Sequence, residues 1–165
     1  MNVTFETKYK NKAGKDEWLT PPEIIKALGG FDLDPCSPIN RPWSTANKHF
    51  TIEDDGLIQD WNGRVWCNPP YGDAAKLWLN KCADYGNAIA LTFARTETRM
   101  FFDFVWSKAD AVLFIKGRLK FYHITGVKGD SAGAPSVLIA YGKENAIILE
   151  NCGIPGKFIN LTTNK

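Results

Sequence analysis

The chain has 165 residues, 44% of them hydrophobic and 23% charged, so we expect one globular domain with a substantial buried core. A net charge of +2 is too small to indicate nucleic-acid binding, and any basic surface must come from local clustering. The sequence shows no apolar signal segment, no membrane-spanning apolar run and no Cys-x-x-Cys pair among its four cysteines. We therefore expect a cytoplasmic protein with neither a membrane span nor a metal site.

Residues 1–16 carry four lysines and little hydrophobic pattern. They are typical of a flexible basic arm, followed by a single domain over residues 17–165. An arm that contacts phosphate groups is the alternative interpretation, which two acidic residues in the same segment weaken.

The segment from Thr20 to Leu28 has the pattern of a short helix with marked ends. Thr20 is a favourable N-cap, Pro21 suits the first helical position, and Glu23 completes a capping box with Thr20. Gly29 predicts the helix end. A helix start with free N–H groups also favours a ligand carboxylate.

Phe31–Asp34 predicts a short strand that ends at Pro35. Asp34, at the end of this strand, is a candidate for binding an ammonium group or for organising the surrounding loop. A turn carboxylate without a ligand is the simpler interpretation.

Three adjacent acids, Glu53, Asp54 and Asp55, precede Gly56 in a loop-rich region. A solvated turn explains them, and so does binding of sugar hydroxyls or an amine by a carboxylate. Asn47 is a further candidate for the sugar hydroxyls. The pattern does not decide which of the acids would bind.

The apolar run Val65–Cys67 predicts a buried strand. The strand must stop at Pro69 and Pro70, because neither proline can donate to a sheet ladder. Asn68 and Tyr71 are therefore expected beyond a carboxyl-terminal strand end, where ligands bind in open α/β sheets.

The residue types of the tetrapeptide from Asn68 to Tyr71 suit a reaction at an amino group on a planar ring. The side-chain oxygen of Asn68 and the carbonyl of Pro69 can converge on one amino group, and Tyr71 offers a flat face for a planar ring. The alternative is an ordinary strand-ending turn. The motif resembles the Asn/Asp-Pro-Pro-aromatic signature of amino methyltransferases that use S-adenosylmethionine.

The remainder of the chain alternates helical and strand patterns. This alternation predicts an α/β fold with a mainly parallel sheet flanked by helices. The expected helices cover residues 73–85, 101–108 and 144–152, and the expected strands cover 88–93, 111–115, 136–142 and, more weakly, 158–161.

Cations and aromatics follow two of these strands. Arg95 follows one, and Lys116, Arg118, Lys120 and Phe121 follow another. Such residues suit phosphate contact and base stacking, so we take them as candidates for substrate binding. A hairpin with alternating polar residues is the alternative.

Five motifs occur in one order over roughly residues 16–142, and together they resemble the small phage-type DNA adenine methyltransferases (Dam-like family). The motifs are Trp18–Pro21, Phe31–Pro35, Glu53–Leu57 before a tryptophan, Trp66–Tyr71 and Gly117–Phe121.

The resemblance implies a Rossmann-like class I methyltransferase that binds S-adenosylmethionine and acts on DNA in a bacterial host cell. It implies that Thr20 and Pro21 hold the methionine part of the cofactor. The acid-Pro-x-Cys motif of the cofactor site matches Asp34, Pro35 and Cys36, although the usual Gly-x-Gly does not follow it.

For the remaining site residues, the resemblance implies two further roles. Asn47, Asp54 and Asp55 are candidates for the cofactor's ribose or adenine. The catalytic residues, which would hold the flipped adenine, are Asn68, Pro69, Pro70 and Tyr71. Phe121 would stack on the opposite side of that adenine.

Two other interpretations remain open. An RNA or protein-glutamine methyltransferase would use the same tetrapeptide without a pocket for a flipped DNA base. A nucleic-acid-binding protein that has lost its cofactor site would account for the absent glycine-rich motif.

Overall fold

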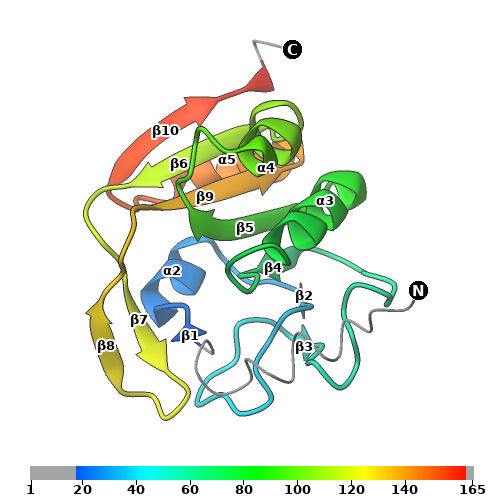
Figure 1. The fold of residues 1–165 in the computed structure, drawn as a ribbon, viewed down its shortest axis with the longest axis vertical. Helices are drawn as coiled ribbons and strands as arrows, with labels where there is room; N and C mark the ends of the chain where they lie inside the picture. The colour runs from blue at the N-terminus through cyan, green and yellow to red at the C-terminus, as the bar shows by residue number, and fades with distance from the viewer. Residues whose placement is uncertain (1–17, 163–165) are drawn as a thin grey trace.

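Two β-sheets organise the computed structural model, which describes residues 18–162 (Figure 1). The larger sheet has seven strands in the order β10-β6-β9-β5-β4-β2-β3, and the smaller has three in the order β1-β7-β8. The larger sheet contains β2 (Leu33–Asp34), β3 (Lys48–His49), β4 (Val65–Cys67), β5 (Ala88–Phe93), β6 (Ala111–Ile115), β9 (Ser136–Tyr141) and β10 (Gly156–Asn160). The smaller contains β1 (Trp18–Leu19), β7 (Lys120–His123) and β8 (Lys128–Ser131).

The larger sheet is mixed, so the expected mainly parallel, helix-flanked Rossmann-like sheet is wrong. The three pairs among β3, β2, β4 and β5 are parallel, whereas β5–β9, β9–β6 and β6–β10 are antiparallel. The smaller sheet is antiparallel throughout. The reason for the error lies in β9, which is buried along its whole length. A continuous apolar run indicates burial on both faces, not the direction of the neighbouring strands.

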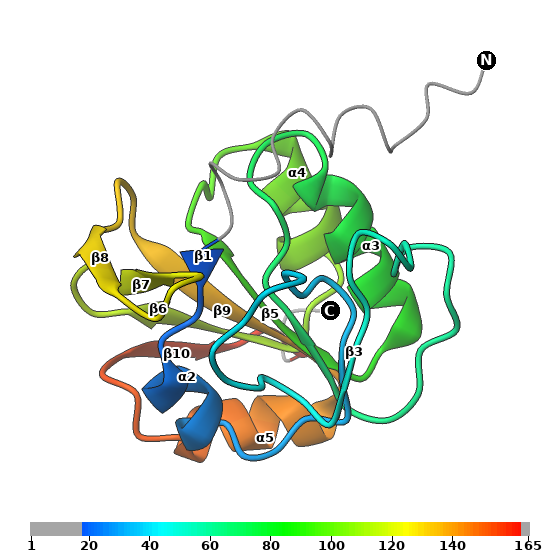
Figure 2. The ribbon, with the colours of Figure 1, turned by 90° about the horizontal axis from the view of Figure 1, so that it is seen from below.

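Short helices accompany the sheets, with α3 and α4 on one side of the larger sheet and α2 and α5 on the other (Figure 2). They range from three to eleven residues and do not form the continuous helical layers of a Rossmann-like fold. The helices are α2 (Pro22–Ala27), α3 (Ala75–Tyr85), α4 (Arg99–Phe101) and α5 (Lys143–Asn151), and a π-helical turn over Phe102–Trp106 continues α4.

The beginning of α2 differs from the sequence-based expectation. Its N-cap is Pro21, and no side chain caps the helix. The predicted capping box between Thr20 and Glu23 is therefore wrong. The end of the helix agrees with the prediction, because Gly29 follows with a φ of 81° that favours glycine.

Strands of the larger sheet alternate their side chains between two hydrophobic clusters, one on each face. Val65 and Cys67 of β4 belong to the cluster that includes α3, whereas Trp66 belongs to the cluster that includes α2 and α5. All three residues are 0% exposed. Burial on both faces therefore holds β4 in place and determines where its carboxyl end lies.

The loop before β4 packs tightly against the end of β2. A Cβ atom added to Gly56 would lie 2.0 Å from the carbonyl oxygen of Pro35. Lys81 of α3 holds the same loop, because its Nζ donates to the carbonyls of Gly56 (3.3 Å), Leu57 (2.8 Å) and Gln59 (2.6 Å). The acidic turn before Gly56 is thus fixed beside the carboxyl end of β2.

We predict that Gly56→Ala lowers the free energy of unfolding by about 1–3 kcal/mol, because the added methyl group would overlap backbone atoms of Pro35. Gly30→Ala is the matched control, since a Cβ there meets nothing within 4 Å, and its effect should stay within about 0.5 kcal/mol. Chemical denaturation of both variants measures the difference. Equal stability of the two would contradict the close packing of the loop.

Candidate active site

Three neighbouring strands end at one edge of the larger sheet. Because β2, β4 and β5 are parallel, their carboxyl ends point to the same edge of the sheet. Leu33 lies opposite Val65 and Cys67 opposite Ala90, so β5 continues beyond β4 to Phe93. Asp34, Asn68 and Arg95 are at or just beyond these ends. The three residues that the sequence placed after strand ends therefore lie along one edge in the mixed sheet as well.

Thr20 and Asn68 meet at this edge. The side-chain nitrogen of Asn68 donates a hydrogen bond to the Thr20 hydroxyl over 3.3 Å. Thr20 is only 2% exposed, and Asn68 is half-buried. Two segments separated by 48 positions are thus joined by polar side chains, and Thr20 serves this contact instead of the helix cap expected from the sequence.

The tyrosine of the Asn-Pro-Pro-Tyr motif stacks on a phenylalanine. The ring centroids of Tyr71 and Phe93 are 4.2 Å apart with an interplanar angle of 8°. Burial raises the pKa of the Tyr71 hydroxyl, so this group is neutral across the physiological range. Sequence reasoning missed Phe93, because a final aromatic residue in an apolar strand has no signal that separates it from the core.

Around these residues, Pro69 is buried, and Pro70 is half-buried. The guanidinium of Arg95 lies 5.9 Å from the centroid of the Phe93 ring, so this predicted substrate contact lies next to the stacked pair.

Asp34 is a buried carboxyl at the end of β2, only 4% exposed. It accepts hydrogen bonds from the backbone N–H of Cys36 (3.1 Å) and from the Thr45 hydroxyl. Burial raises its pKa to about 6, and the bonds from Thr45 and Cys36 and the nearby Arg41 cation oppose this shift. Asp34 therefore ties together the loop that follows β2, and Thr45 is a partner that the sequence did not reveal.

The predicted ribose-binding residues lie in the loops around β2 and β3. Asn47 is exposed. The Asp54 carboxylate, also exposed, accepts from the backbone N–H of Thr51 at 2.8 Å. Asp55 has a positive φ of 54° and accepts from the N–H of Leu57 at 3.2 Å. Both carboxylates thus shape the acidic turn, and each retains acceptor capacity for a further ligand.

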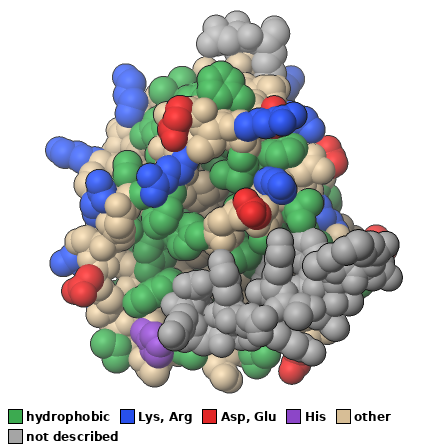
Figure 3. All heavy atoms as spheres, viewed as in Figure 1, with side chains coloured by type: hydrophobic (Ala, Val, Ile, Leu, Met, Phe, Trp, Pro, Cys, Tyr) green, Lys and Arg blue, Asp and Glu red, His purple; other side chains and the backbone are tan. Residues whose placement is uncertain are grey.

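The cations predicted to bind substrate follow β6. Lys116, Arg118 and Lys120 are all exposed, and Arg118 donates to the carbonyl of Ala132 at 3.2 Å. Figure 3 shows Lys and Arg side chains along the left of the molecule, with hydrophobic side chains beside them. Phe121 is separate from this surface, because it is 6% exposed and packs in the cluster with α2 and α5.

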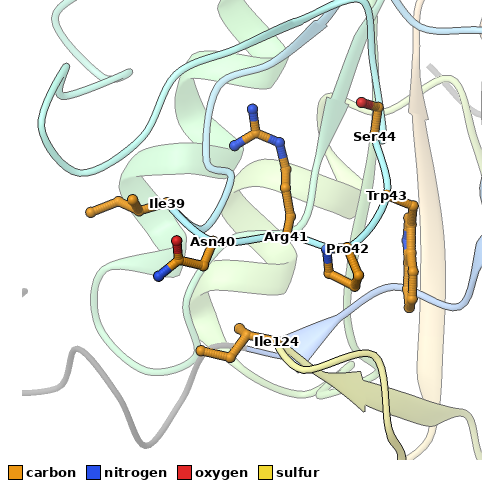
Figure 4. A pocket seen from close by; sticks show the side chains of 7 residues that line it. All are labelled: Ile39, Asn40, Arg41, Pro42, Trp43, Ser44 and Ile124. Atoms are coloured by element: carbon orange, nitrogen blue, oxygen red, sulfur yellow. The ribbon is translucent and has the colours of Figure 1, made fainter.

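A cavity of about 530 Å³ lies between the loop after β2 and the turn of the β7–β8 hairpin (Figure 4). The hairpin contacts that loop through Tyr122, whose ring packs edge-on against Trp43 at 5.1 Å. The cavity is lined by Ile39, Asn40, Arg41, Pro42, Trp43, Ser44 and Ile124, and by none of the Asn-Pro-Pro-Tyr residues.

Comparison with protein-family models found a match to the DNA N-6-adenine-methyltransferase (Dam) family over residues 7–149. The chain belongs to this family. The match includes the carboxyl ends of β2, β4 and β5 and the whole β7–β8 hairpin. Comparisons with curated proteins and with solved structures each found no match.

Membership of the Dam family makes this chain one of the DNA adenine methyltransferases. Within residues 18–162, no helix is long and apolar enough to cross a membrane. The same residues contain no group of three or more His, Cys, Asp or Glu side chains that could hold a metal ion. The predicted basic arm at residues 1–16 lies outside the described part of this Dam family member.

The Asp34 pKa predicts a pH-dependent stability. Because its folded-state pKa of about 6 exceeds the ordinary 3.8, the folded protein binds the proton more tightly and loses stability as pH rises through this interval. The loss between pH 4 and pH 7 should be about 2–3 kcal/mol. Asp34→Asn cannot ionise, so it should lack this component.

Urea denaturation of the wild type and of Asp34→Asn at pH 4 and pH 7 isolates the Asp34 contribution, because all other titrating groups are shared. An identical change in unfolding free energy for both proteins would contradict the raised pKa.

Proposed function

We propose that this chain transfers a methyl group from S-adenosylmethionine to the exocyclic N6 amine of a flipped-out adenine in DNA. The observations that carry the proposal are the Asn68–Thr20 hydrogen bond and the Tyr71–Phe93 stack, both at the sheet edge that follows β4 and β5, in a chain of the Dam family. We propose further that residues 17–165 form the single catalytic domain.

The adenine amine is a poor nucleophile because its lone pair is delocalised into the ring. The side-chain oxygen of Asn68 and the carbonyl of Pro69 would accept its two hydrogens and favour the tetrahedral nitrogen that can attack. S-adenosylmethionine supplies the methyl group as an electrophile on a positively charged sulfur. As the N–C bond would form, the methyl–sulfur bond would break and the sulfur would leave as the neutral thioether of S-adenosylhomocysteine. The amine would become cationic, the two acceptors would stabilise this charge, and the extra proton would then pass to water.

The residues around β2 fit the polar groups of S-adenosylmethionine. Asp54 and Asp55, held beside Pro35 by the packing of Gly56, would accept hydrogen bonds from the ribose hydroxyls, and Asn47 offers a further amide. We propose that Asp34 acts with Pro35 and Cys36 by fixing the loop that borders the cofactor. Both oxygens of its carboxyl already accept hydrogen bonds from the chain, which supports this organising role.

The Tyr71 ring is the proposed support for the flipped base. Because Phe93 covers one face of Tyr71, adenine would stack on the other face. Phe93 would then hold Tyr71 at a constant angle to Asn68, so that the amine reaches the two acceptors. The buried ring of Phe121 does not fit the second stacking position implied by the family resemblance.

The DNA backbone would contact the exposed cations at the sheet edge. We propose that Arg95, Lys116, Arg118 and Lys120 bind phosphates, which would compensate for the small net charge of the whole chain. Incubation with labelled S-adenosylmethionine and DNA, RNA or protein tests the proposal, and label appearing only in RNA or protein would contradict it.

We predict that Asn68→Ala lowers kcat by about 100-fold, because a preorganised acceptor contributes on the order of 3 kcal/mol to barrier lowering. Binding of S-adenosylmethionine, measured by calorimetry, should change little. Asn62→Ala, which alters an exposed asparagine in the preceding loop, is the control and should retain full activity. Undiminished turnover in Asn68→Ala would refute its assigned role.

We also predict that Tyr71→Ala slows methylation of a matched duplex more than that of a duplex with a mispaired target adenine. Flipping a paired base costs a few kcal/mol, and stacking on an aromatic side chain returns roughly 1–3 kcal/mol. Tyr71→Phe keeps the ring and should be mild.

Initial rates on the two duplexes at saturating cofactor, with a melting curve for each variant, measure this effect. An equal loss on both duplexes would indicate that Tyr71 only packs against Phe93.

A further inference from the structure

The ammonium group of Lys81 binds three backbone carbonyls in the segment that follows the acidic turn. Its Nζ atom donates to the carbonyl oxygens of Gly56 (3.3 Å), Leu57 (2.8 Å) and Gln59 (2.6 Å). An ammonium group carries three hydrogens and cannot accept, whereas a carbonyl oxygen can only accept. The direction of each bond is therefore set by the chemistry of the two groups, and the three donors of Lys81 match three acceptors.

Two of these carbonyl-bearing residues in turn bind the acids of the turn. The N–H of Leu57 donates to the Asp55 carboxylate at 3.2 Å, and the side-chain nitrogen of Gln59 donates to the carbonyl of Asp54 at 2.7 Å. Asp55 has a φ of 54°, a left-handed conformation that costs free energy for a residue with a side chain. The bonds from Lys81 therefore hold the backbone that keeps both acids in place.

The acidic turn borders an open volume. A cavity of about 400 Å³ lies against it, and both Asp55 and Lys81 line this cavity. A ligand there would lie close to the Asp55 carboxylate. Because the donors of Lys81 are directed at carbonyls, its ammonium group serves the turn and not a ligand in the cavity.

The helix that carries Lys81 also follows the Asn-Pro-Pro-Tyr motif. α3 begins shortly after Tyr71, and its residues Trp78, Leu79 and Cys82 are buried in the hydrophobic cluster on one face of the larger sheet. A close-packed helix of this kind cannot shift without disturbing the core. The acidic turn and the motif therefore both take their positions from one anchored helix.

We propose that Lys81 is a positioning residue for the cofactor, because its ammonium group holds the acidic turn in the arrangement in which Asp54 and Asp55 bind the ribose of S-adenosylmethionine. This inference rests on the proposed function, which assigns the ribose to these two carboxylates. A turn that is already ordered before the cofactor arrives reduces the free-energy cost of binding.

Lys81→Met keeps the length of the side chain and removes its three donors. If the turn of this variant has the binding arrangement about one tenth of the time, the Kd for S-adenosylhomocysteine rises about ten-fold, as calorimetry would measure. The kcat at saturating S-adenosylmethionine should stay within about two-fold of the wild type, because bound cofactor restores the turn. Should Lys81→Met fail to fold, Lys81→Gln retains an amide donor and should raise the Kd by a smaller factor.

Hydrogen exchange of the turn, measured without cofactor, separates positioning from direct contact. The N–H of Leu57 is bonded to the Asp55 carboxylate, and the N–H of Ile58 donates to the carbonyl of Asp55 at 3.0 Å. Lys81→Met should speed exchange at these two positions by about ten-fold. A raised Kd with unchanged exchange would indicate that Lys81 contacts the cofactor directly, and it would overturn the positioning role.

Tyr85→Phe is the matched control on the same helix. Tyr85 lies one helical turn after Lys81, and its hydroxyl donates to the carbonyl of Gly63 at 2.5 Å, beyond the acidic turn. This variant should lower the melting temperature without changing the Kd or the exchange of Leu57 and Ile58. An equal rise in Kd for Tyr85→Phe and Lys81→Met would show that general destabilisation is the cause, against the proposed role of Lys81.

The possible outcomes separate this inference from the proposed function. A wild-type protein that binds neither S-adenosylmethionine nor S-adenosylhomocysteine overturns both. Wild-type affinity that persists when Asp54→Asn and Asp55→Asn are combined overturns the ribose role of the turn and this inference with it, and leaves the methylation of adenine in place. A wild type that binds the cofactor, with an unchanged Kd in Lys81→Met, overturns only the positioning role.

Discussion

The carboxyl end of β4 is the constraint on which the arrangement of the site depends. β4 pairs with β2 on one side and β5 on the other, and all its side chains are buried. The chain cannot slide along its neighbours without moving Trp66 from one hydrophobic cluster to the other. Two prolines then end the ladder, so Asn68 leaves the sheet at a defined point.

Buried polar side chains hold the loops around this point. Thr20 and Asp34 would each cost free energy if buried without a partner, and each forms a hydrogen bond to another segment or loop residue. The raised pKa of Asp34 shows that its burial still opposes ionisation despite those bonds. In this Dam family member, burial of the Asp34 carboxylate thus lowers stability at the strand end where the chemistry is proposed to occur.

The antiparallel strands of the larger sheet and the candidate site lie in different parts of the fold. The error in the predicted strand directions therefore does not alter the arrangement of the candidate site. Asp34 and Asn68 depend on β2, β4 and β5, which are parallel. The antiparallel strands β9 and β10 lie beyond β5 and complete the core. The β7–β8 hairpin precedes β9, and through its pairing with β1 it also fixes the segment that leads to Thr20.

The sequence by itself determined the local features of this protein. The apolar runs at 88–93 and 111–115 predicted β5 and β6 with their observed bounds, and the five ordered motifs indicated the family that the family model then matched. Prolines after Cys67 were sufficient to place Asn68 beyond a strand end, because proline acts through its own backbone. Only the tertiary structure decided the strand directions, the partner of Thr20 and the Tyr71–Phe93 stack. These depend on contacts between residues far apart in the chain, and neither hydrophobic periodicity nor residue type specifies which distant segments meet.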